Sequence, residues 1–177
     1  MIHTTHYASP LGDLLLAEQD GALIGLWMEH QKYFPKHFRE NECTDCPVLL
    51  QTKQWLSRYF AGEKPSVREL PLAPAGSDFR QSVWDILCEI PYGQVTTYGA
   101  IAKQIAARRG LSSMSAQAVG GAVGHNPISI IIPCHRVVGA NGSLTGYAGG
   151  IGRKLQLLTL EGAEVQSQFL SAADMRQ

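Results

Sequence analysis

The segment from Ile131 to Gly139 reads IIPCHRVVG and places a cysteine directly before a histidine and an arginine. A cysteine that follows a run of isoleucines is usually a small buried apolar residue. A thiol beside cationic side chains ionises more readily, and the thiolate is the form that attacks a substrate or binds a metal. Cys134 is therefore a candidate nucleophile, with core packing and metal ligation as the alternatives.

His135 is the first candidate for activating Cys134, but its position limits how it can act. Neighbouring side chains of an extended chain point to opposite faces, so His135 requires either a turn or a bridging water. A cysteine hydrolase would take its histidine from elsewhere in the sequence. Four histidines of the first half are available for that role: His3, His6, His30 and His37. The local pattern leaves a hydrolase and an acceptor of alkyl groups both open.

The other three cysteines carry weaker signals. Cys43 and Cys46 form a lone CxxC motif, and no second pair has the spacing that a four-ligand zinc site needs. We interpret them as two independent thiols in a surface loop, ahead of a metal site or a redox pair. Cys88 falls within an apolar helical pattern and is expected in the core. No metal is therefore expected.

Charge is unevenly distributed along the 177 residues, although 15 Lys and Arg balance 15 Asp and Glu. From Ile90 to Leu160 there is no acidic residue, whereas six basic residues give a local charge of +6 and leave −6 for the rest: Lys103, Arg108, Arg109, Arg136, Arg153 and Lys154. A long basic segment of this kind can bind a polyanion, or it can be an ordinary solvated face. Because Cys134 lies inside it, we favour the polyanion.

The first half of the chain has the pattern of a small sheet with one helix. Turn residues flank strands expected at Leu14–Ala17 and Ala22–Met28, and helical spacing follows over Val48–Phe60. Prolines and glycines then accumulate, which predicts a domain boundary close to Ala73–Ser77. An apolar fraction of 45% supports a packed core, and neither a signal peptide nor a membrane-spanning stretch is present, so we expect an intracellular protein.

The second half has the pattern of helices. One begins after a cap at Ser77 or Asp78, and a second after Thr96 or Thr97, which together form the skeleton of a helix-turn-helix. A third, Ala116–Gly124, consists almost wholly of Ala, Val and Gly. Its glycines reduce helix stability, which indicates close approach by another helix or by DNA.

The remaining segment leads to the candidate nucleophile and beyond it. After Asn126 and Pro127, which end the third helix, Ile128–Ile132 is expected as a strand. Asn141-Gly142 is typical of a hairpin turn, and a final helix is expected over Arg153–Glu161. All these elements belong to one region that would position Cys134.

The segment NPISIIIPCHRVVGANGSLTGYAGG resembles the active-site segment of the methylated-DNA–protein-cysteine methyltransferases, also called O6-alkylguanine-DNA alkyltransferases. The Pro-Cys-His-Arg-Val core carries most of this likeness. It extends back through DFRQSVWDILCEIPYGQVTTYG and YFAGE, and forward through RKLQLLTLEG. The opening SPLGDLLLAEQDGALIGL is similar to the family's N-terminal domain more loosely, so the resemblance covers nearly the whole chain.

The resemblance implies an in-line attack by the sulfur of Cys134 on the alkyl carbon of an O6-alkylated guanine, with guanine as the leaving group. It implies that His135, acting through water with Glu161, removes the thiol proton. Asn126 would brace the turn that carries the site, and Tyr98 would donate a proton to the departing base.

The resemblance also implies a guanine pocket and a DNA surface. The pocket would be built from Val137, Tyr147, Ala148 and Lys154. The third helix would lie in the minor groove while the damaged nucleotide is flipped out of the duplex. Its contacts, with one from the active-site segment, would be Ala116, Gln117, Ala118, Gly120 and Arg136. Gln117 departs from the family, which commonly has an arginine there to fill the gap left by the flipped base.

Together these observations predict an α/β protein with an N-terminal sheet-plus-helix domain at 1–75 and a winged-helix-like domain at 76–177 that binds DNA and accepts the alkyl group. It would be a cytoplasmic monomer that repairs double-stranded DNA in a single turnover, without a cofactor, membrane or obligate protein partner. Three rivals have different signatures. A binding protein of this family would lack the cysteine, a hydrolase would not need the bare third helix, and a helix-turn-helix regulator would carry bulky polar residues on it.

Overall fold

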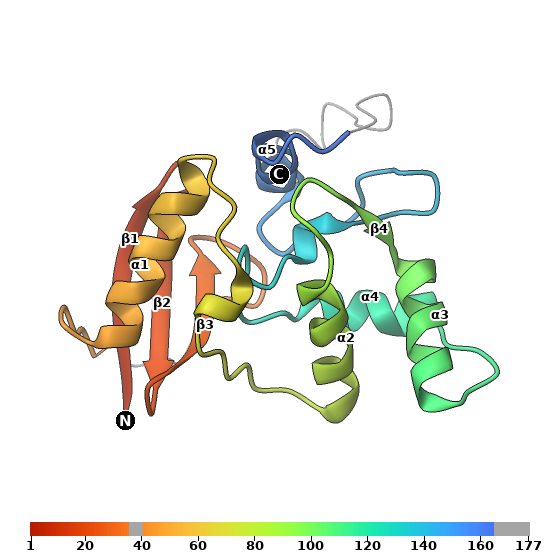
Figure 1. Cartoon of the computed structure of the whole chain (residues 1–177), viewed down its shortest axis with the longest axis horizontal. Helices are drawn as coiled ribbons and strands as arrows, with labels where there is room; N and C mark the ends of the chain where they lie inside the picture. Colours follow the sequence, from red (N-terminus) through yellow and green to blue (C-terminus); the bar gives the residue numbers. More distant parts are fainter. Residues whose placement is uncertain (36–40, 165–177) are drawn as a thin grey trace. The chain divides into compact units, whose positions relative to one another are not determined.

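The computed structural model describes residues 1–35 and 41–164, and its elements are labelled in Figure 1. The contacts divide the chain into two units. The first unit contains Met1–Ala75 together with Pro127–Ile131, and the second contains Gly76–Asn126 and the chain from Ile132 onward. A short segment of the second half of the sequence therefore belongs to the first unit.

The first unit is built on an antiparallel sheet in the order β1-β2-β3, with β1 at Ile2–Ser9, β2 at Gly12–Gln19 and β3 at Ala22–Met28. Asp20 and Gly21 join β2 to β3 and both have positive φ, at 54° and 80°, as a two-residue hairpin turn of type I′ requires. The two strands expected from the sequence are present. β1 was not expected, because its sequence IHTTHYAS has few apolar residues.

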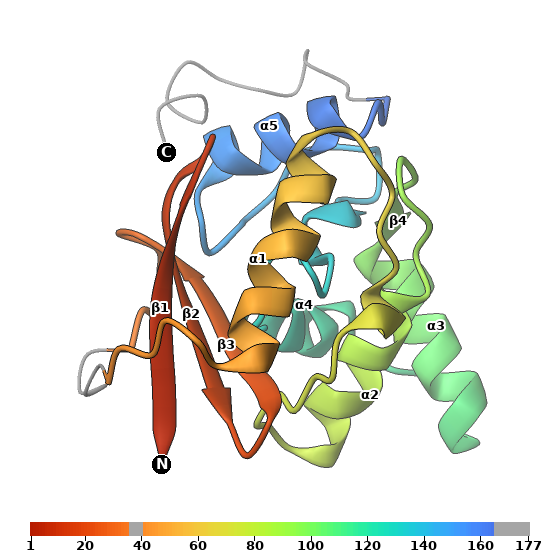
Figure 2. The same cartoon turned by 60° about the vertical axis from the view of Figure 1, so that its left-hand side comes forward.

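Helix α1, Pro47–Phe60, lies across one face of this sheet (Figure 2). Its apolar side chains are buried, as are those of β2 that point to the same face, so the two elements form the core of the first unit. The largest fully buried side chains of this core include Leu14, Leu16, Leu49, Leu56 and Tyr59. The hydroxyls of Tyr7 on β1 and Ser57 on α1 are 3.0 Å apart, which identifies the face of β1 that α1 covers.

The outer edge of β3 is closed by irregular chain rather than by another strand. Leu23 exchanges backbone hydrogen bonds with the segment around Leu72, and Leu26 does so with the segment around Ile128. The strand expected at Ile128–Ile132 is wrong. Only Ile128 forms a β-bridge, and the chain then turns at Ile130, whose φ of 72° is unusual for a β-branched residue.

The second unit begins with three helices (Figure 1): α2 at Asp78–Cys88, α3 at Tyr98–Arg109 and α4 at Ala116–Gly124. Each has a hydroxyl cap, because Ser77, Thr97 and Ser115 accept hydrogen bonds from backbone N–H groups in the first turn. Helix α4 packs on both α2 and α3. Its Gly-rich sequence is therefore held helical by its cap and its neighbours rather than by intrinsic propensity.

The rest of the second unit surrounds Cys134. The 3-10 helix η2, Cys134–Arg136, leads directly into β5, Val137–Val138, which pairs in parallel with β4, Thr96–Thr97. Helix α5 spans Ile151–Leu160. Its apolar face joins β5 and the loop between them in a cluster formed by Val138, Leu144, Ile151 and Leu158. Asn141-Gly142 is a turn as expected, but it joins no hairpin because β5 pairs with β4.

The structure confirms the α/β fold class, with a small sheet and helix followed by a mainly helical unit. No helix within residues 1–35 and 41–164 is both long enough and apolar enough to cross a bilayer.

The contact between α2 and α4 depends on one buried indole. Trp84 is 2% exposed, and its Nε1 donates a hydrogen bond to the carbonyl of Ala122 at 2.9 Å. Trp84→Phe removes the donor and leaves the carbonyl buried, so we expect a loss of about 1–3 kcal/mol in the free energy of unfolding. Urea denaturation of both proteins measures it. An unchanged midpoint would show that this hydrogen bond does not hold α4 in place.

Candidate active site

Cys134 lies in two consecutive tight turns. Pro133, with φ −82° and ψ 66°, is the centre of an inverse γ-turn in which Cys134 N–H donates to the carbonyl of Ile132 at 2.8 Å. Arg136 N–H then donates to the carbonyl of Pro133 at 3.0 Å and begins η2. The chain is therefore not extended at this point, and the turn allows Cys134 and His135 to belong to one site.

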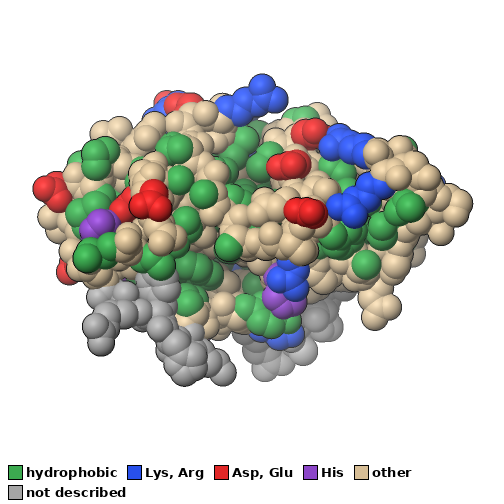
Figure 3. All heavy atoms as spheres, turned by 90° about the horizontal axis from the view of Figure 1, so that it is seen from below, with side chains coloured by type: hydrophobic (Ala, Val, Ile, Leu, Met, Phe, Trp, Pro, Cys, Tyr) green, Lys and Arg blue, Asp and Glu red, His purple; other side chains and the backbone are tan. Residues whose placement is uncertain are grey.

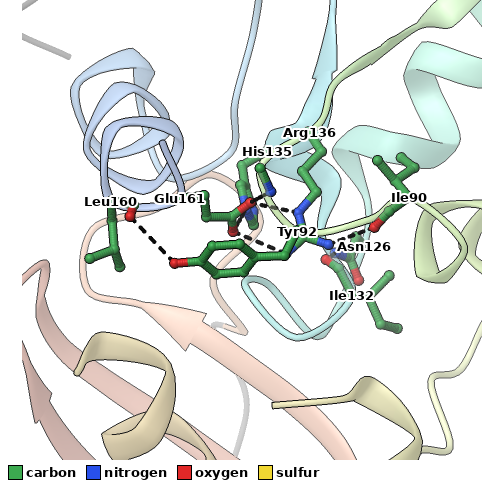
Figure 4. A network of polar contacts seen from close by, with 9 residues as sticks. Ile90, Tyr92, Asn126, Ile132, His135, Arg136, Leu160 and Glu161 are labelled. Carbon is green, nitrogen blue, oxygen red and sulfur yellow. Dashed lines mark hydrogen bonds and ion pairs between the residues drawn. The ribbon is translucent and has the colours of Figure 1, made fainter. Parts of the chain in front are cut away.

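Asn126 holds this turn from the end of α4. Its side chain is buried, and Nδ2 donates to the carbonyl of Ile132 at 2.8 Å (Figure 4). The side chain of Asn126 also hydrogen-bonds the thiol of Cys134. A single amide thus fixes both the backbone of the turn and the group that the turn presents.

Glu161 joins the two residues that follow Cys134 (Figure 4). Its Oε2 is 2.7 Å from Nε2 of His135, and its Oε1 accepts from Nε of Arg136 at 2.8 Å. Nη2 of Arg136 reaches Oε2 at 3.1 Å, which makes the ion pair bidentate. The carboxylate side chain is 0% exposed, so the end of α5 and η2 are tied together by a buried network.

The turn after α2 completes this network. Nη1 of Arg136 donates to the carbonyl of Ile90 at 2.7 Å, and the guanidinium lies 5.7 Å from the ring centroid of Tyr92. The hydroxyl of Tyr92 in turn donates to the carbonyl of Leu160 at 3.3 Å. Sequence reasoning missed Tyr92, since a tyrosine between Pro91 and Gly93 looks like an ordinary turn residue.

The protonation states of Glu161 and His135 follow from these contacts. Burial on its own would raise the pKa of Glu161, but hydrogen bonds from His135 and Arg136 outweigh burial and hold that pKa well below its ordinary value. Burial lowers the pKa of His135 despite the nearby carboxylate. The imidazole is therefore neutral at rest. With Nε2–H donated to Glu161, its Nδ1 is the basic nitrogen.

Nδ1 of His135 is buried and has no hydrogen-bond partner among the residues that the structure describes. A buried basic nitrogen without a protein partner can accept a proton from a neighbouring group or from a water. The position of this atom is the feature of the network that most directly indicates chemistry.

The thiol of Cys134 is kept in its neutral form. Burial raises its pKa, and the hydrogen bond from Asn126, the charge of Lys154 and the nearby Tyr147 only partly offset that effect. The neighbouring cations therefore do not ionise the thiol as the sequence suggested, because Arg136 is already paired with Glu161. The thiol needs a base before it can attack.

Lys154 organises the loop that precedes α5. Its side chain is buried, and Nζ donates to the carbonyls of Val137 and Thr145, at 2.6 Å and 2.9 Å, with Gly146 at 3.5 Å. Burial lowers the pKa of Lys154 to about 8, so the ammonium is still the major form at neutral pH. This cation fixes β5 and the loop that leads to Tyr147 and Ala148.

The two tyrosines expected at the site lie close to the thiol. Tyr147 lies near enough to Cys134 to lower the pKa of its thiol, and Tyr98 hydrogen-bonds the side chain of Thr145. Burial raises the pKa of Tyr98, which keeps its hydroxyl protonated. The structure therefore brings Tyr98, Tyr147 and Cys134 together from α3, the loop and η2.

Helix α4 presents a surface made mostly of small residues. Ala116, Gln117 and Ala118 are exposed at its start. A Cβ added to Gly120 would lie 3.8 Å from the ring of Tyr98, whereas one added to Gly121 would meet nothing within 4 Å. Close packing within the second unit therefore does not explain the glycine at position 121.

Several cations of the acid-free segment are engaged within the protein. Arg108 pairs with Glu89 at 2.8 Å, and Arg109 lies over the ring of Phe79 and donates to Ser82. On the face shown in Figure 3, basic side chains lie beside acidic ones rather than forming one continuous basic patch. The segment is thus a weaker polyanion site than its sequence indicated.

The remaining cysteines differ from Cys134. Cys43 and Cys46 are joined by a disulfide, so their interpretation as two independent thiols is wrong. Cys88 is a half-buried residue of α2, where burial and the charges of Asp85 and Glu89 raise its pKa to about 11. Cys88 is therefore a poor nucleophile at neutral pH.

Two family models cover almost the whole chain. Residues 78–163 match the 6-O-methylguanine DNA methyltransferase DNA-binding domain, and residues 2–74 match the ribonuclease-like domain of the same enzymes. The fold and site are thus those of a protein that transfers alkyl groups from guanine. The chain belongs to the methylated-DNA–protein-cysteine methyltransferase family.

Individual relatives agree with this assignment. The chain is 47% identical over 161 residues to the methylated-DNA–protein-cysteine methyltransferase of Mycobacterium tuberculosis H37Rv, covering 91% of this chain and 93% of that one. It is 40% identical over 162 residues to the Haemophilus influenzae protein of the same name, covering 90% and 86%. A crystal structure of Mycobacterium tuberculosis OGT in complex with DNA superposes with a TM-score of 0.77 at 43% identity, covering 90% and 92%.

The buried carboxylate makes a prediction about stability. Glu161→Gln leaves the guanidinium of Arg136 without its counter-charge, so we expect a loss of about 3–5 kcal/mol at pH 7, measured by urea denaturation. Because the pKa of Glu161 is lowered on folding, its contribution is complete above the unfolded pKa of about 4.3 and is lost progressively as the pH falls from there toward the much lower folded pKa. The wild type should therefore lose more stability than Glu161→Gln between pH 6 and pH 3.

Glu89→Gln is the matched control, because it removes the exposed ion pair with Arg108. We expect that change to cost at most about 1 kcal/mol. Equal losses for the two variants would contradict the role given to the buried carboxylate.

Proposed function

We propose that the chain repairs double-stranded DNA by transferring an alkyl group from O6 of guanine to Sγ of Cys134. The observation that supports this most directly is a buried neutral thiol beside a neutral His135 whose Nε2 is bound to Glu161. Relatives over nearly the whole chain bear the name methylated-DNA–protein-cysteine methyltransferase. The site supplies what that chemistry needs, a nucleophile and a base held in one network.

The proposed reaction begins with proton removal. Nδ1 of His135 takes the thiol proton through a bridging water, and the imidazolium that forms is stabilised by the carboxylate of Glu161. Arg136 keeps Glu161 ionised and oriented, so its role is positioning. The sequence-based role for Arg136 as a DNA contact is replaced, because its guanidinium is bound inside the site.

The thiolate then displaces guanine from the alkyl carbon. A carbon–sulfur bond forms as the bond between that carbon and O6 breaks, and the electron pair leaves with the base. Tyr98, whose hydroxyl is protonated, gives a proton to the departing guanine. The product is a thioether on Cys134, which has no route back to the thiol here, so each molecule acts once.

The pocket for the base is proposed beside the thiol of Cys134. Val137 and Ala148 would line it, and Tyr147, which lies close enough to Cys134 to lower the pKa of its thiol, would form a wall. Lys154 supports the pocket by fixing the carbonyls of β5 and of the loop. These residues would bind and orient the base, and the proposed reaction requires no cofactor or metal.

Helix α4 is the proposed DNA contact of the second unit. A duplex base cannot reach a buried thiol unless its nucleotide is flipped out of the stack. Small residues at Ala116, Ala118 and Gly120 would let the helix enter the minor groove, and Gln117 would occupy the gap in the duplex. The crystal structure of Mycobacterium tuberculosis OGT in complex with DNA supports DNA binding by this fold.

The catalytic groups all come from one chain, which supports a monomer without an obligate protein partner. We also propose the cytoplasm as its working compartment, since Cys134 can accept an alkyl group only as a free thiol. A hydrolase is less well supported, because the histidine beside Cys134 is its own neighbour and not one of the four in the first half.

The stoichiometry of transfer tests the proposed function. After incubation with an excess of a duplex containing O6-methylguanine, intact mass spectrometry should show one added methyl group per chain, and peptide mapping should place it on Cys134. Cys134→Ser should abolish the mass gain, whereas Cys88→Ser should leave it unchanged. Repeated turnover, or a methyl group on Cys88, would contradict a single-use acceptor.

Gln117 generates a second prediction because it replaces the arginine common in the family. Gln117→Ala should slow repair of a duplex much more than reaction with free O6-benzylguanine, which needs no base flipping. Gln117→Arg should tighten DNA binding and steepen its log–log salt dependence by about one. Binding is measured by fluorescence anisotropy at several salt concentrations, and repair by quenched-flow transfer of a labelled alkyl group.

Gln104→Ala is the matched control, since Gln104 is another exposed glutamine, on α3. It should change neither reaction. If Gln117→Ala affects the duplex and the free base equally, Gln117 has no special role in the duplex.

A further inference from the structure

The first unit contains a cluster of metal-ligating side chains that the proposed repair reaction does not use. One ligand atom from each of His3, Glu18 and Cys46 lies within 4.8 Å of the other two. Cys43 lies outside this group but is joined to Cys46 by the disulfide, so it can supply a fourth ligand once the disulfide opens. The sequence showed only the lone CxxC motif, because His3 and Glu18 are distant from it along the chain.

The fold places this cluster where the sheet meets the start of α1. His3 on β1 and Glu18 on β2 are directly opposed in the antiparallel ladder, so their side chains lie on one face. The next pairs along that face are Thr5 with Leu16 and Tyr7 with Leu14, and Tyr7 contacts α1. The face covered by α1 therefore ends in a polar pair beside Cys46, the residue that precedes the helix.

Glu18 is held in place as a ligand would be. The residue is 6% exposed, and its Oε2 accepts a hydrogen bond from Gly21 N–H at 3.0 Å. Its other oxygen, Oε1, lies 2.5 Å from Nδ1 of His3. A backbone bulge between Ala17 and Glu18 sets this direction. A buried carboxylate is unusual in a strand unless it is paired or binds a metal.

The loop that carries the cysteines is also fixed by the backbone. Thr4 N–H donates to the carbonyl of Asn41, and Cys43 N–H donates to the carbonyl of Thr4, both at 2.9 Å. The CxxC motif is thus docked on β1 next to His3. Cys46 is the N-cap of the 14-residue helix α1, and its side chain makes no capping hydrogen bond. The start of a helix favours a negative group such as a thiolate.

We propose that in the reduced protein Cys43, Cys46, His3 and Glu18 bind one Zn²⁺ ion. A phosphine or dithiol reductant supplies the two electrons that open the disulfide, and the ion displaces the two thiol protons. Two sulfurs, one imidazole and one carboxylate form a four-coordinate set suited to zinc, with bonds of about 2.0–2.3 Å. The ion replaces the direct contact between His3 and Glu18 and joins the loop, the sheet and α1.

The site has a structural role rather than a catalytic one. All four positions of a tetrahedral zinc site are taken by protein ligands, which leaves none open for a substrate. Because the bound ion connects three parts of the first unit, it should raise the melting temperature of the reduced protein by mass action. The disulfide and the metal are alternative links between the same two sulfurs, so oxidation should exclude the ion.

The test measures zinc in the whole chain. The protein is reduced with a phosphine, exchanged into buffer without reductant under argon, and titrated with Zn²⁺ in competition with a chromophoric chelator. We expect one equivalent to bind, with a rise in melting temperature, and we expect the oxidised protein to bind none at this site. Co²⁺ in place of Zn²⁺ should give thiolate-to-metal charge-transfer absorption in the reduced protein.

His3→Ala and Cys46→Ser should weaken zinc binding by more than about tenfold, since even an outer-shell partner contributes that much. His6→Ala is the matched control. His6 also faces a carboxylate, with Nδ1 2.6 Å from Oδ2 of Asp13, but it points to the opposite face of β1 from His3 and is not a member of the cluster. It should bind zinc as the wild type does.

Absence of a bound equivalent in the reduced protein would overturn the proposal, as would equal losses for His3→Ala and His6→Ala. Circular dichroism at 20 °C and alkyl transfer to Cys134 show whether each variant is folded. Because Cys134 lies in the other unit, failure of the metal site leaves the proposed repair activity untouched, and the two hypotheses can be separated.

Discussion

The buried carboxylate of Glu161 is the constraint on which the second unit depends. A carboxylate without exposure is tolerated only when its oxygens are fully hydrogen-bonded, and here His135, Arg136 and the N–H of Gly93 supply the donors. These donors come from η2 and from the turn after α2, while Glu161 ends α5. The carboxylate that joins these parts of the second unit also fixes the imidazole of His135 beside Cys134. A substitution of Glu161 should therefore change both the stability of the unit and the reactivity of Cys134.

The network and its burial shift the pKa values of the site residues in different directions. The network holds the pKa of Glu161 low while burial raises the pKa of Cys134 and lowers that of His135. At rest the site thus contains a thiol and a neutral base instead of a thiolate and an imidazolium. A buried thiol in this form reacts poorly with oxidants and small electrophiles. For a protein that uses its cysteine once, a nucleophile that rests in its less reactive thiol form is an advantage.

Local signals in the sequence predicted what local interactions determine. The caps Ser77 and Thr97 and the bounds of α4 follow from hydrogen bonds within one turn of the chain. Contacts between distant residues were less visible. β1 lacks an apolar pattern, and the turn at Ile130 replaces a strand because the edge of β3 receives only Ile128. The resemblance to a family supplied the partnership of His135 with Glu161, which residue spacing alone could not show.

The acid-free segment shows how a charge pattern can mislead. The acids that neutralise Arg108 and Arg136 are Glu89 and Glu161, which lie immediately before and after the segment. Because these two guanidiniums are engaged in ion pairs, the proposed DNA binding by α4 cannot depend on them for its affinity. Gly121 has open space where a side chain would lie, so nothing within the described chain explains its cost to the helix. An external surface that needs close backbone approach does explain it. The proposed entry of α4 into a DNA groove therefore rests on the small residues of the helix rather than on net charge.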